Sequence, residues 1–216
     1  MTDSVTTVDT NDMLLIHRLI RREIGMLPRL FRGAAGDPAR AKVVAAHATE
    51  MLDFLHIHHT GEDQLMWPVL RSRVKADDGL IDRMESQHGQ LASAVDEVRA
   101  ALPGWAESAD AQTGERMAAT LDGAIAVLTE HLAEEEARIL PLVSAHLSPT
   151  EWKALADHGF AAIPRRRRLV ILGHILEEAD EDERRRFMKV VPPPARLAYN
   201  LVGRRQFARE TAAIRG

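Results

Sequence analysis

The chain contains no cysteine. Disulfide bonds, thiolate metal ligands, iron–sulfur clusters and cysteine nucleophiles are therefore excluded. Aromatic residues are also scarce, at 4% of the 216 residues, whereas Ala, Leu and Arg are abundant. Because strands are rich in aromatic and β-branched residues, this composition favours helices over sheets. A hydrophobic content of 45% with 28% charged residues is ordinary for a soluble folded protein.

Long apolar runs are missing as well. The residues up to Asp12 hold no apolar segment of the kind found in secretory signals. The longest apolar run, residues 169–176, contains a glycine and a histidine and is far too short to span a bilayer. We therefore expect a cytoplasmic protein that makes no membrane contact.

Charge is distributed unevenly along the chain. From residue 147 onward there are 14 Lys or Arg against 9 Asp or Glu, a net charge of +5, so the first 146 residues carry −9 of the total of −4. A basic segment can mark a nucleic-acid or acidic-partner surface. No aromatic stacking platform accompanies these arginines, however, so a solvated helical surface is the favoured interpretation and nucleic-acid binding is not expected.

One short pattern occurs twice. His58 is followed by Glu62 after four residues and by a proline after ten, and His131 is followed by Glu135 and a proline at the same spacings. Residues four apart lie on one face of a helix, with about 5–6 Å between their Cβ atoms. Each pair can therefore direct an imidazole nitrogen and a carboxylate oxygen at a shared point.

Periodicity alone leaves the choice of histidine in the first copy open, because His56 and His59 follow a neighbouring stripe. The proline that follows decides between them. His58 lies ten residues before the proline of the first copy, just as His131 lies ten residues before the proline of the second. We accordingly expect His56 and His59 to be surface groups or outer partners of the site. Glu134 and Glu136, which flank the second glutamate, are expected to face solvent. Both prolines should kink their helices.

Apolar spacing predicts four long helices, with a turn at 77–79 and the longest loop at 102–113. The helices are expected at about 10–31, 38–74, 81–98 and 113–146. Residues 148–216 should add short helices, the first starting at a Ser148–Glu151 capping box and the next at Pro164, with His174 packed inside this extension. The predicted fold is all-α: an up-down antiparallel four-helix bundle over 10–147 with a C-terminal helical extension at 148–216.

Each long helix carries a histidine on or beside its apolar face. His17 and His88 lie on the first and third helices, so the four helices together offer four imidazoles and two glutamates. Six ligands are too many for a tetrahedral zinc site and suit two carboxylate-bridged ions, with iron or manganese favoured by the nitrogen and oxygen donors. Burying two carboxylates without a cation would be very costly.

The chain resembles the hemerythrin-like family, also called the HHE cation-binding domain, over residues 10–147. The resemblance rests on four pieces: His17, HHTGEDQLMWP (58–68), ESQHGQL (85–91) and HLAEEEARILP (131–141). It implies a non-haem centre of two iron ions whose ligands are His17, His58, Glu62, His88, His131 and Glu135. Glu62 and Glu135 would be the bridging carboxylates, with an oxo, hydroxo or water bridge beside them.

The sequence departs from the oxygen-carrying members of this family at two places. Those proteins have a fifth histidine one turn beyond the ligand of the third helix, where this chain has Ala92. Their acid on the fourth helix is often Asp at a spacing of five, whereas here it is Glu135 at a spacing of four. The resemblance then implies a more symmetric and more open site. It favours peroxide breakdown of a peroxidase or catalase type, or handling of O2 or nitric oxide, over reversible O2 transport.

Three alternatives remain open. The first is an iron- or oxygen-sensing metal module whose basic extension contacts a partner. The second is a ferritin-like site, which needs two Glu-x-x-His motifs, whereas only Glu85–His88 fits. The third is a structural bundle without metal, in which removing Glu62 or Glu135 would be harmless or stabilising.

Overall fold

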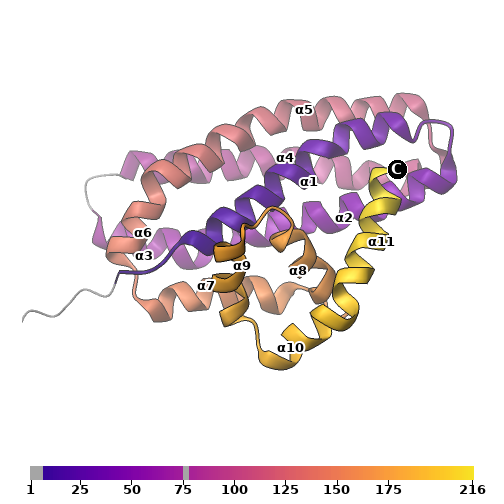
Figure 1. Cartoon of the computed structure of the whole chain (residues 1–216). Coiled ribbons are helices and arrows are strands. Elements are labelled where there is room, and N and C mark those ends of the chain that lie inside the picture. Colours follow the sequence, from indigo (N-terminus) through magenta and orange to yellow (C-terminus); the bar gives the residue numbers. More distant parts are fainter. Residues whose placement is uncertain (1–6, 75–77) are drawn as a thin grey trace, which may run out of the picture.

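The computed structural model describes residues 7–74 and 78–216, and within these ranges every regular element is helical, as the composition predicted. Figure 1 shows long helical rods lying side by side, with shorter helices along one flank. In chain order the elements are α1 (Asn11–Gly33), α2 (Pro38–Gly61), η1 (Glu62–Met66), α3 (Trp67–Arg73), α4 (Asp78–Ser108), α5 (Ala111–Glu134), η2 (Glu135–Ile139), α6 (Leu140–His146), α7 (Pro149–Ala162), α8 (Arg168–Leu176), α9 (Glu181–Val190), α10 (Pro193–Ala198), η3 (Tyr199–Gly203) and α11 (Arg204–Arg215).

The N-terminal helical unit, residues 11–146, is organised by four helix–helix contacts. Helix α1 packs against α2 and α5, and α4 packs against the same two helices. The four rods are therefore α1, α2–η1–α3, α4 and α5–η2–α6, and they enclose a common interior. Most of that interior is one large apolar cluster, in which Phe31 and Trp105 meet edge to face with ring centroids 5.1 Å apart. Burial of this apolar surface is the main term that holds the rods together.

A second, smaller apolar cluster fills one end of the unit around Trp67, Leu70 and Ile139. On α2 and η1 the chain passes from Leu55 of the large cluster to Met66 of the small cluster. The polar residues of the first His-Glu pair lie between those two positions. The two clusters therefore enclose a layer of buried polar side chains.

Two π-helical segments occupy the places where kinks were expected. Segment η1 begins at Glu62 and η2 at Glu135, and each ends shortly before the proline of its copy. In each, the N–H of the residue before the proline bonds the carbonyl oxygen of the glutamate five residues earlier. A proline in a helix lacks its own N–H donor, and π-helical bulges are frequent at functional sites. The sequence repeat is therefore also a repeat of local structure.

The loop predicted at 102–113 is wrong. Helix α4 continues through Pro103 to Ser108, and only Ala109 and Asp110 connect it to α5. Trp105 is buried in the large cluster, and packing of this kind outweighs the poor helix propensity of the nearby proline and glycine. Ala109 takes the positive φ of 50° that the tight turn needs, and Asp110 then caps α5 through the Thr113 N–H. The turn predicted at 77–79 begins outside the described residues, and Gly79 belongs to α4.

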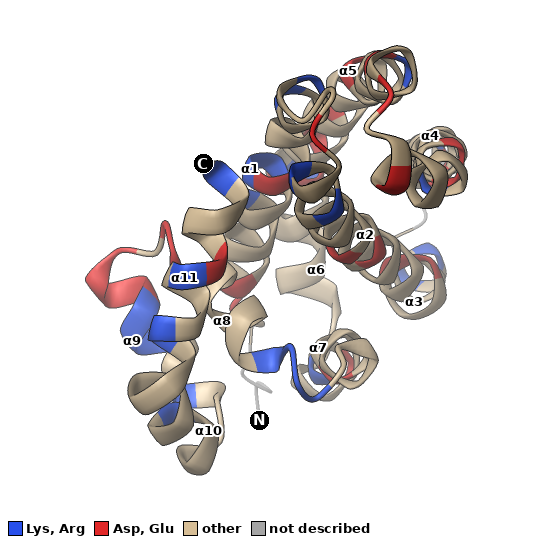
Figure 2. Cartoon of the chain, turned by 90° about the vertical axis from the view of Figure 1, so that its right-hand side faces the viewer, with Lys and Arg blue, Asp and Glu red and all other residues tan. Residues whose placement is uncertain are grey.

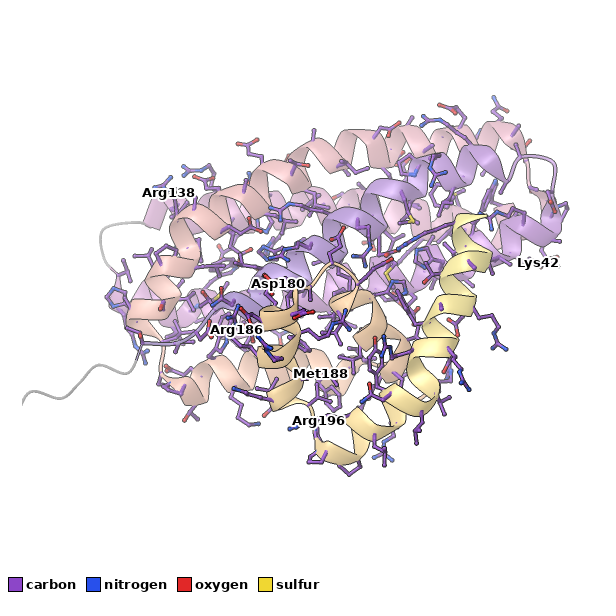
Figure 3. All side chains as sticks on the ribbon, in the orientation of Figure 1. Lys42, Arg138, Asp180, Arg186, Met188 and Arg196 are labelled. Carbon is purple, nitrogen blue, oxygen red and sulfur yellow. The ribbon has the colours of Figure 1, made fainter. Side chains whose placement is uncertain are left out.

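The C-terminal extension, residues 149–215, lies against the α1 and α2 side of the N-terminal unit, as the end-on view in Figure 2 shows. Its first helix starts at the predicted capping box, in which Ser148 accepts from the Glu151 N–H and Glu151 caps the Ser148 N–H. Pro164 does not open a helix, because residues 165–167 form turns and α8 starts at Arg168. Asp180, labelled in Figure 3, caps α9 by accepting from the Glu183 N–H.

A buried carboxylate ties this extension to the rest of the chain. Glu23 of α1 is fully buried, with His174 Nδ1 of α8 at 3.1 Å and His47 Nε2 of α2 at 3.0 Å. Arg22 Nε lies 2.7 Å from the same carboxylate, and Arg215 Nη2 lies 3.0 Å from it. His174 packs within the extension as expected, edge to face against Phe207 at 4.9 Å, and it also joins α8 to α1. Part of the opposite charge of the two halves is thus neutralised within the molecule.

Among the described residues no helix is long and apolar enough to cross a membrane.

Candidate metal centre

The structure brings all six predicted site residues into the polar layer between the two apolar clusters. His17 comes from α1, His58 from α2, His88 from α4 and His131 from α5, while the two glutamates open η1 and η2. Each side chain is at most 7% exposed, and both glutamate side chains are fully buried. Four helical rods thus contribute to one buried group of imidazoles and carboxylates.

The carboxylate of Glu62 lies between two histidines of different rods. Its Oε1 is 3.2 Å from His58 Nε2, and its Oε2 is 3.3 Å from His88 Nε2. Two ligands at about 2.1 Å from one ion and at right angles to each other lie about 3 Å apart. Each oxygen of Glu62 therefore forms, with its own histidine, a pair of donors spaced for a shared ion.

Glu135 occupies an equivalent position on the opposite rod. Its Oε2 is 3.3 Å from His17 Nε2 and 3.8 Å from His131 Nε2. His131 Nε2 also lies 3.2 Å from His88 Nε2, so two imidazoles converge without any carboxylate between them. The two acids therefore link a histidine pair on α1 and α2 with a histidine pair on α4 and α5.

Most of these inward-facing atoms have no hydrogen-bond partner. His17 Nε2, His58 Nε2 and both oxygens of each of the two glutamates are buried and unpaired. A buried polar group without a partner costs about 1–3 kcal/mol, and native structures hold few of them. So many unpaired donors and acceptors in one place fit a cation that the residues surround.

The outward-facing nitrogens, by contrast, are fixed by hydrogen bonds. His17 donates through Nδ1 to Glu136 Oε1 at 2.9 Å, and His88 donates through Nδ1 to Asp63 Oδ1 at 2.7 Å. His131 Nδ1 lies 3.2 Å from the Gln87 side-chain oxygen. Such bonds fix the tautomer and the ring orientation, so that Nε2 is the nitrogen available to a metal.

These outer partners correct one expectation. Glu136 does not point to solvent, because it is half-buried and accepts from both His17 and Arg21, the latter at 2.6 Å. Glu134 does not point freely to solvent either, because its side chain is only 18% exposed, against 27% for Glu136, and it pairs with Arg83 at 2.8 Å and with Arg138 at 2.7 Å. Figure 3 shows Arg138 on the outside of the helix. Asp63 gains a second donor from the Trp67 ring N–H at 3.0 Å.

Burial and neighbouring charges shift the pKa values of the site residues, some upward and some downward. Burial raises the pKa of Glu62, and the nearby Glu135 charge raises it further. Burial also opposes the ionisation of Glu135, but His17 and the other imidazoles outweigh it and hold that pKa below its ordinary value. Burial acts against the protonation of His17 too, yet Glu135 and Glu136 raise its pKa to about 9. For His131 burial prevails and lowers the pKa to about 4. A bound cation would replace protons in such a site.

His59, expected to be a surface group or an outer partner of the site, does not lie at the surface. Its side chain is buried, and its Nε2 has no hydrogen-bond partner. Its ring stacks on that of His88, with centroids 4.0 Å apart and planes at 17°. One ligand atom each of His59, His88 and His131 lie within 4.8 Å of one another. His56 is exposed, as expected. The sequence feature that could have indicated a buried His59 is the adjacent pair of histidines at 58–59, because neighbouring positions on a helix can face two different rods.

Two groupings of possible ligands therefore share this layer. One contains His17, His58, Glu62 and Glu135, and the other contains His59, His88 and His131. A third grouping, Glu23 with His174 and Glu177, lies elsewhere. Arg22 and Arg215 pair with both of its carboxylates, so that grouping is already neutralised by protein cations.

A helical protein with imidazoles and buried acids contributed by four rods belongs to the class of metal-binding helical proteins. The family model described as the hemerythrin HHE cation-binding domain matches residues 8–143 of this chain. The chain belongs to that family, and the sequence resemblance is thereby confirmed. No match was found among curated proteins. No solved structure matched the chain either.

Proposed function

We propose that this protein is a non-haem di-iron protein that reacts with small oxidants, with peroxide or other redox chemistry favoured over O2 transport. One observation supports the proposal most strongly: each buried carboxylate lies between histidines of two different rods and lacks any hydrogen-bond partner. The cytoplasm is the proposed location, and the N-terminal unit is taken to be an up-down antiparallel bundle around the centre.

Two ions account for the donors better than one. An ion accepts at most about six ligands of this kind, and the carboxylates separate the histidines into two sets. Glu62 extends one oxygen towards His58 and the other towards His88, which is the arrangement expected of a bridging carboxylate. Nitrogen and oxygen donors without thiolate favour iron or manganese over softer metals.

The protein's own residues prepare the site for small molecules. A carboxylate-bridged iron pair, when bound, supplies the one-electron chemistry that no side chain in this layer offers. The surrounding side chains of the small cluster, among them Met66 and Trp67, are fully buried and keep bulk water away. Asp63, held by the Trp67 ring N–H, orients His88 through its Nδ1. A diatomic ligand or peroxide fits such a closed site better than a large substrate.

The alternative function is iron or oxygen sensing, with the extension contacting a partner protein. A specific observation favours keeping it: Val190, Leu197, Leu201 and Val202 are large apolar residues that are 58–76% exposed, and all lie between α9 and η3. Apolar side chains exposed together often mark a contact surface. If a partner protein binds this surface, replacing Leu197 and Leu201 by Asp should abolish that binding. The iron content of the protein should stay unchanged.

The proposal is tested by loading the purified protein with iron and measuring metal content together with absorption spectra. We expect two iron ions per chain and an absorption band that changes on addition of azide or peroxide. Peroxide should disappear faster with the loaded protein than with the metal-free protein. Slow or absent peroxide turnover alongside tight, reversible O2 binding would overturn the preference for peroxide chemistry. Absence of bound metal would overturn the proposal as a whole.

A further inference from the structure

Five buried imidazoles, not four, lie in the layer that holds the two carboxylates, and the fifth belongs to His59, which packs against His88 and His131. On the basis of the proposed di-metal function, we infer that His59 is a metal ligand that shares one ion with His88 and His131, while His17 and His58 share the other. The inference assigns a role to a side chain outside the six expected ligands, and it makes the centre asymmetric.

The position of the His59 ring carries this inference. Its Nε2 is buried and unpaired, in the same condition as the Nε2 atoms of His17 and His58. Its ring stacks on His88 at 4.0 Å and meets the His131 ring edge to face at 5.2 Å. Their ligand atoms lie within 4.8 Å of one another. Two nitrogens bound to one ion at about 2.1 Å lie at most about 4.2 Å apart, so a small turn of the rings on metal binding would let one ion hold all three. Burying an imidazole nitrogen with no partner is costly, and a shared ion removes that cost.

Helix geometry explains how adjacent residues serve different ions. Successive side chains on an α-helix point about 100° apart. Helix α2 packs against both α1 and α4, so two neighbouring positions can face these two rods. His58 meets His17 of α1 edge to face at 5.2 Å, whereas His59 stacks on His88 of α4. The histidine doublet thus divides between the two groups.

The same geometry explains why α4 needs only one histidine. Ala92, one turn beyond His88, is exposed, so a ligand at that position would point to solvent. Met84, one turn before His88, is buried in the small apolar cluster. The other buried positions of α4 beside His88 are held by Gln87, which bonds His131, and by Leu91, so the fifth imidazole comes from α2.

Counting donors then indicates where a small ligand binds. His59, His88 and His131 with the two carboxylates offer five donors to one ion. His17 and His58 with the same carboxylates offer four to the other, which leaves that ion with more open positions. The symmetric site expected from the sequence is replaced by one in which a diatomic ligand or peroxide binds on the α1–α2 side.

The test compares iron binding by the wild-type protein with that of His59→Ala and His59→Gln, using His56→Ala as the matched control. His56 lies on the same helix but is exposed. Iron per chain and Mössbauer spectra of the loaded proteins are measured, and circular dichroism of the metal-free forms reports folding. His59→Gln keeps most of the side-chain volume and provides a folded variant if His59→Ala is unstable.

The wild type and His56→Ala should hold two iron ions with two distinct Mössbauer signals. The His59 variants should bind the second ion at least 10-fold more weakly, and added imidazole should restore it in His59→Ala, which loss of packing alone would not explain. If a folded His59 variant held two ions with unchanged signals, His59 would not be a ligand. If the wild type itself held no iron, the proposed function would fail instead, so the two failures are distinguishable.

Discussion

Glu23 and His174 lie 3.1 Å apart, from Oε1 to Nδ1, although 151 positions separate them along the chain. This contact joins α1 to α8, and both side chains are about 1% exposed. It places the C-terminal extension on the N-terminal unit through a buried charge with several partners. This contact is therefore expected to contribute to the stability of the chain.

Replacing Glu23 by Gln should destabilise the protein by about 1–3 kcal/mol, because His174 and His47 lose a charged, buried partner. Arg22 and Arg215 lose one carboxylate but keep Glu177. Urea unfolding of the metal-free proteins measures the effect. Glu130→Gln, an exposed change on α5, is the control and should alter stability by no more than about 0.5 kcal/mol. Equal stability of both variants would show that the network contributes nothing.

The same carboxylate predicts a pH dependence. Burial would raise the pKa of Glu23, but His174, His47 and Arg22 outweigh it and hold that pKa well below the ordinary 4.5. Arg215 and Glu177 also face the network. A lowered folded-state pKa contributes stability above the unfolded-state value and loses it as the pH falls. Wild-type stability should therefore drop more steeply than that of Glu23→Gln below about pH 5. Parallel acid unfolding curves would contradict this.

Removing Glu62, a proposed bridging carboxylate, should act in opposite directions with and without iron. Without iron, Glu62→Ala should be neutral or stabilising, because burial and the Glu135 charge already raise the pKa of Glu62 and disfavour its ionised form. With iron, it should lose the stabilisation that metal binding supplies, about 4 kcal/mol when iron is present at 1,000 times its dissociation constant. Thermal unfolding in iron and in chelator measures both. Glu130→Ala, which removes an exposed acid of α5, should show neither effect.

The outer partners of the histidines should tune metal affinity. Asp63 accepts from His88 and from Trp67, so Asp63→Asn weakens the bond that orients the imidazole. We expect iron affinity to fall 10- to 100-fold, as is typical for such partners. Competition with a chromophoric chelator measures this. Unchanged affinity would mean that Asp63 does not position His88.

Restoring the histidine of the oxygen carriers should have no effect. Ala92 is exposed in this structure, so Ala92→His would place an imidazole in solvent. The iron content and absorption spectrum of Ala92→His should match those of the wild type. A third iron signal or a shifted absorption band would show that α4 turns this position inward.

One local rule, His-x-x-x-Glu ten residues before a proline, appears twice and predicted four of the six site residues. His17 and His88 were predicted from their position on or beside apolar helix faces and from the family resemblance. The structure brings all six into one layer, and metal binding by them stays a prediction. The all-helical fold followed from composition and apolar spacing. Two π-helical segments were not predicted, since the same spacing is compatible with a kinked α-helix. The loop at 102–113 was wrong because Pro103 and Gly104 suggested a break, whereas burial of Trp105 keeps the segment helical.

Other features depend on tertiary contacts that local patterns do not encode. His59 differs from His58 only in which neighbouring rod it faces, and that direction is set by how α2 packs against α1 and α4. No local pattern singled out Glu23, whose partners come from α2, α8 and α11. Positions of this kind become visible only when distant helices are placed together.

The most direct test of the account is anomalous diffraction at the iron absorption edge from crystals of the iron-loaded protein. The account predicts two peaks within the buried layer, one beside His17 and His58 and the other beside His88 and His131, with Glu62 and Glu135 between them. No peak in this layer, or a single peak at the surface, would contradict it.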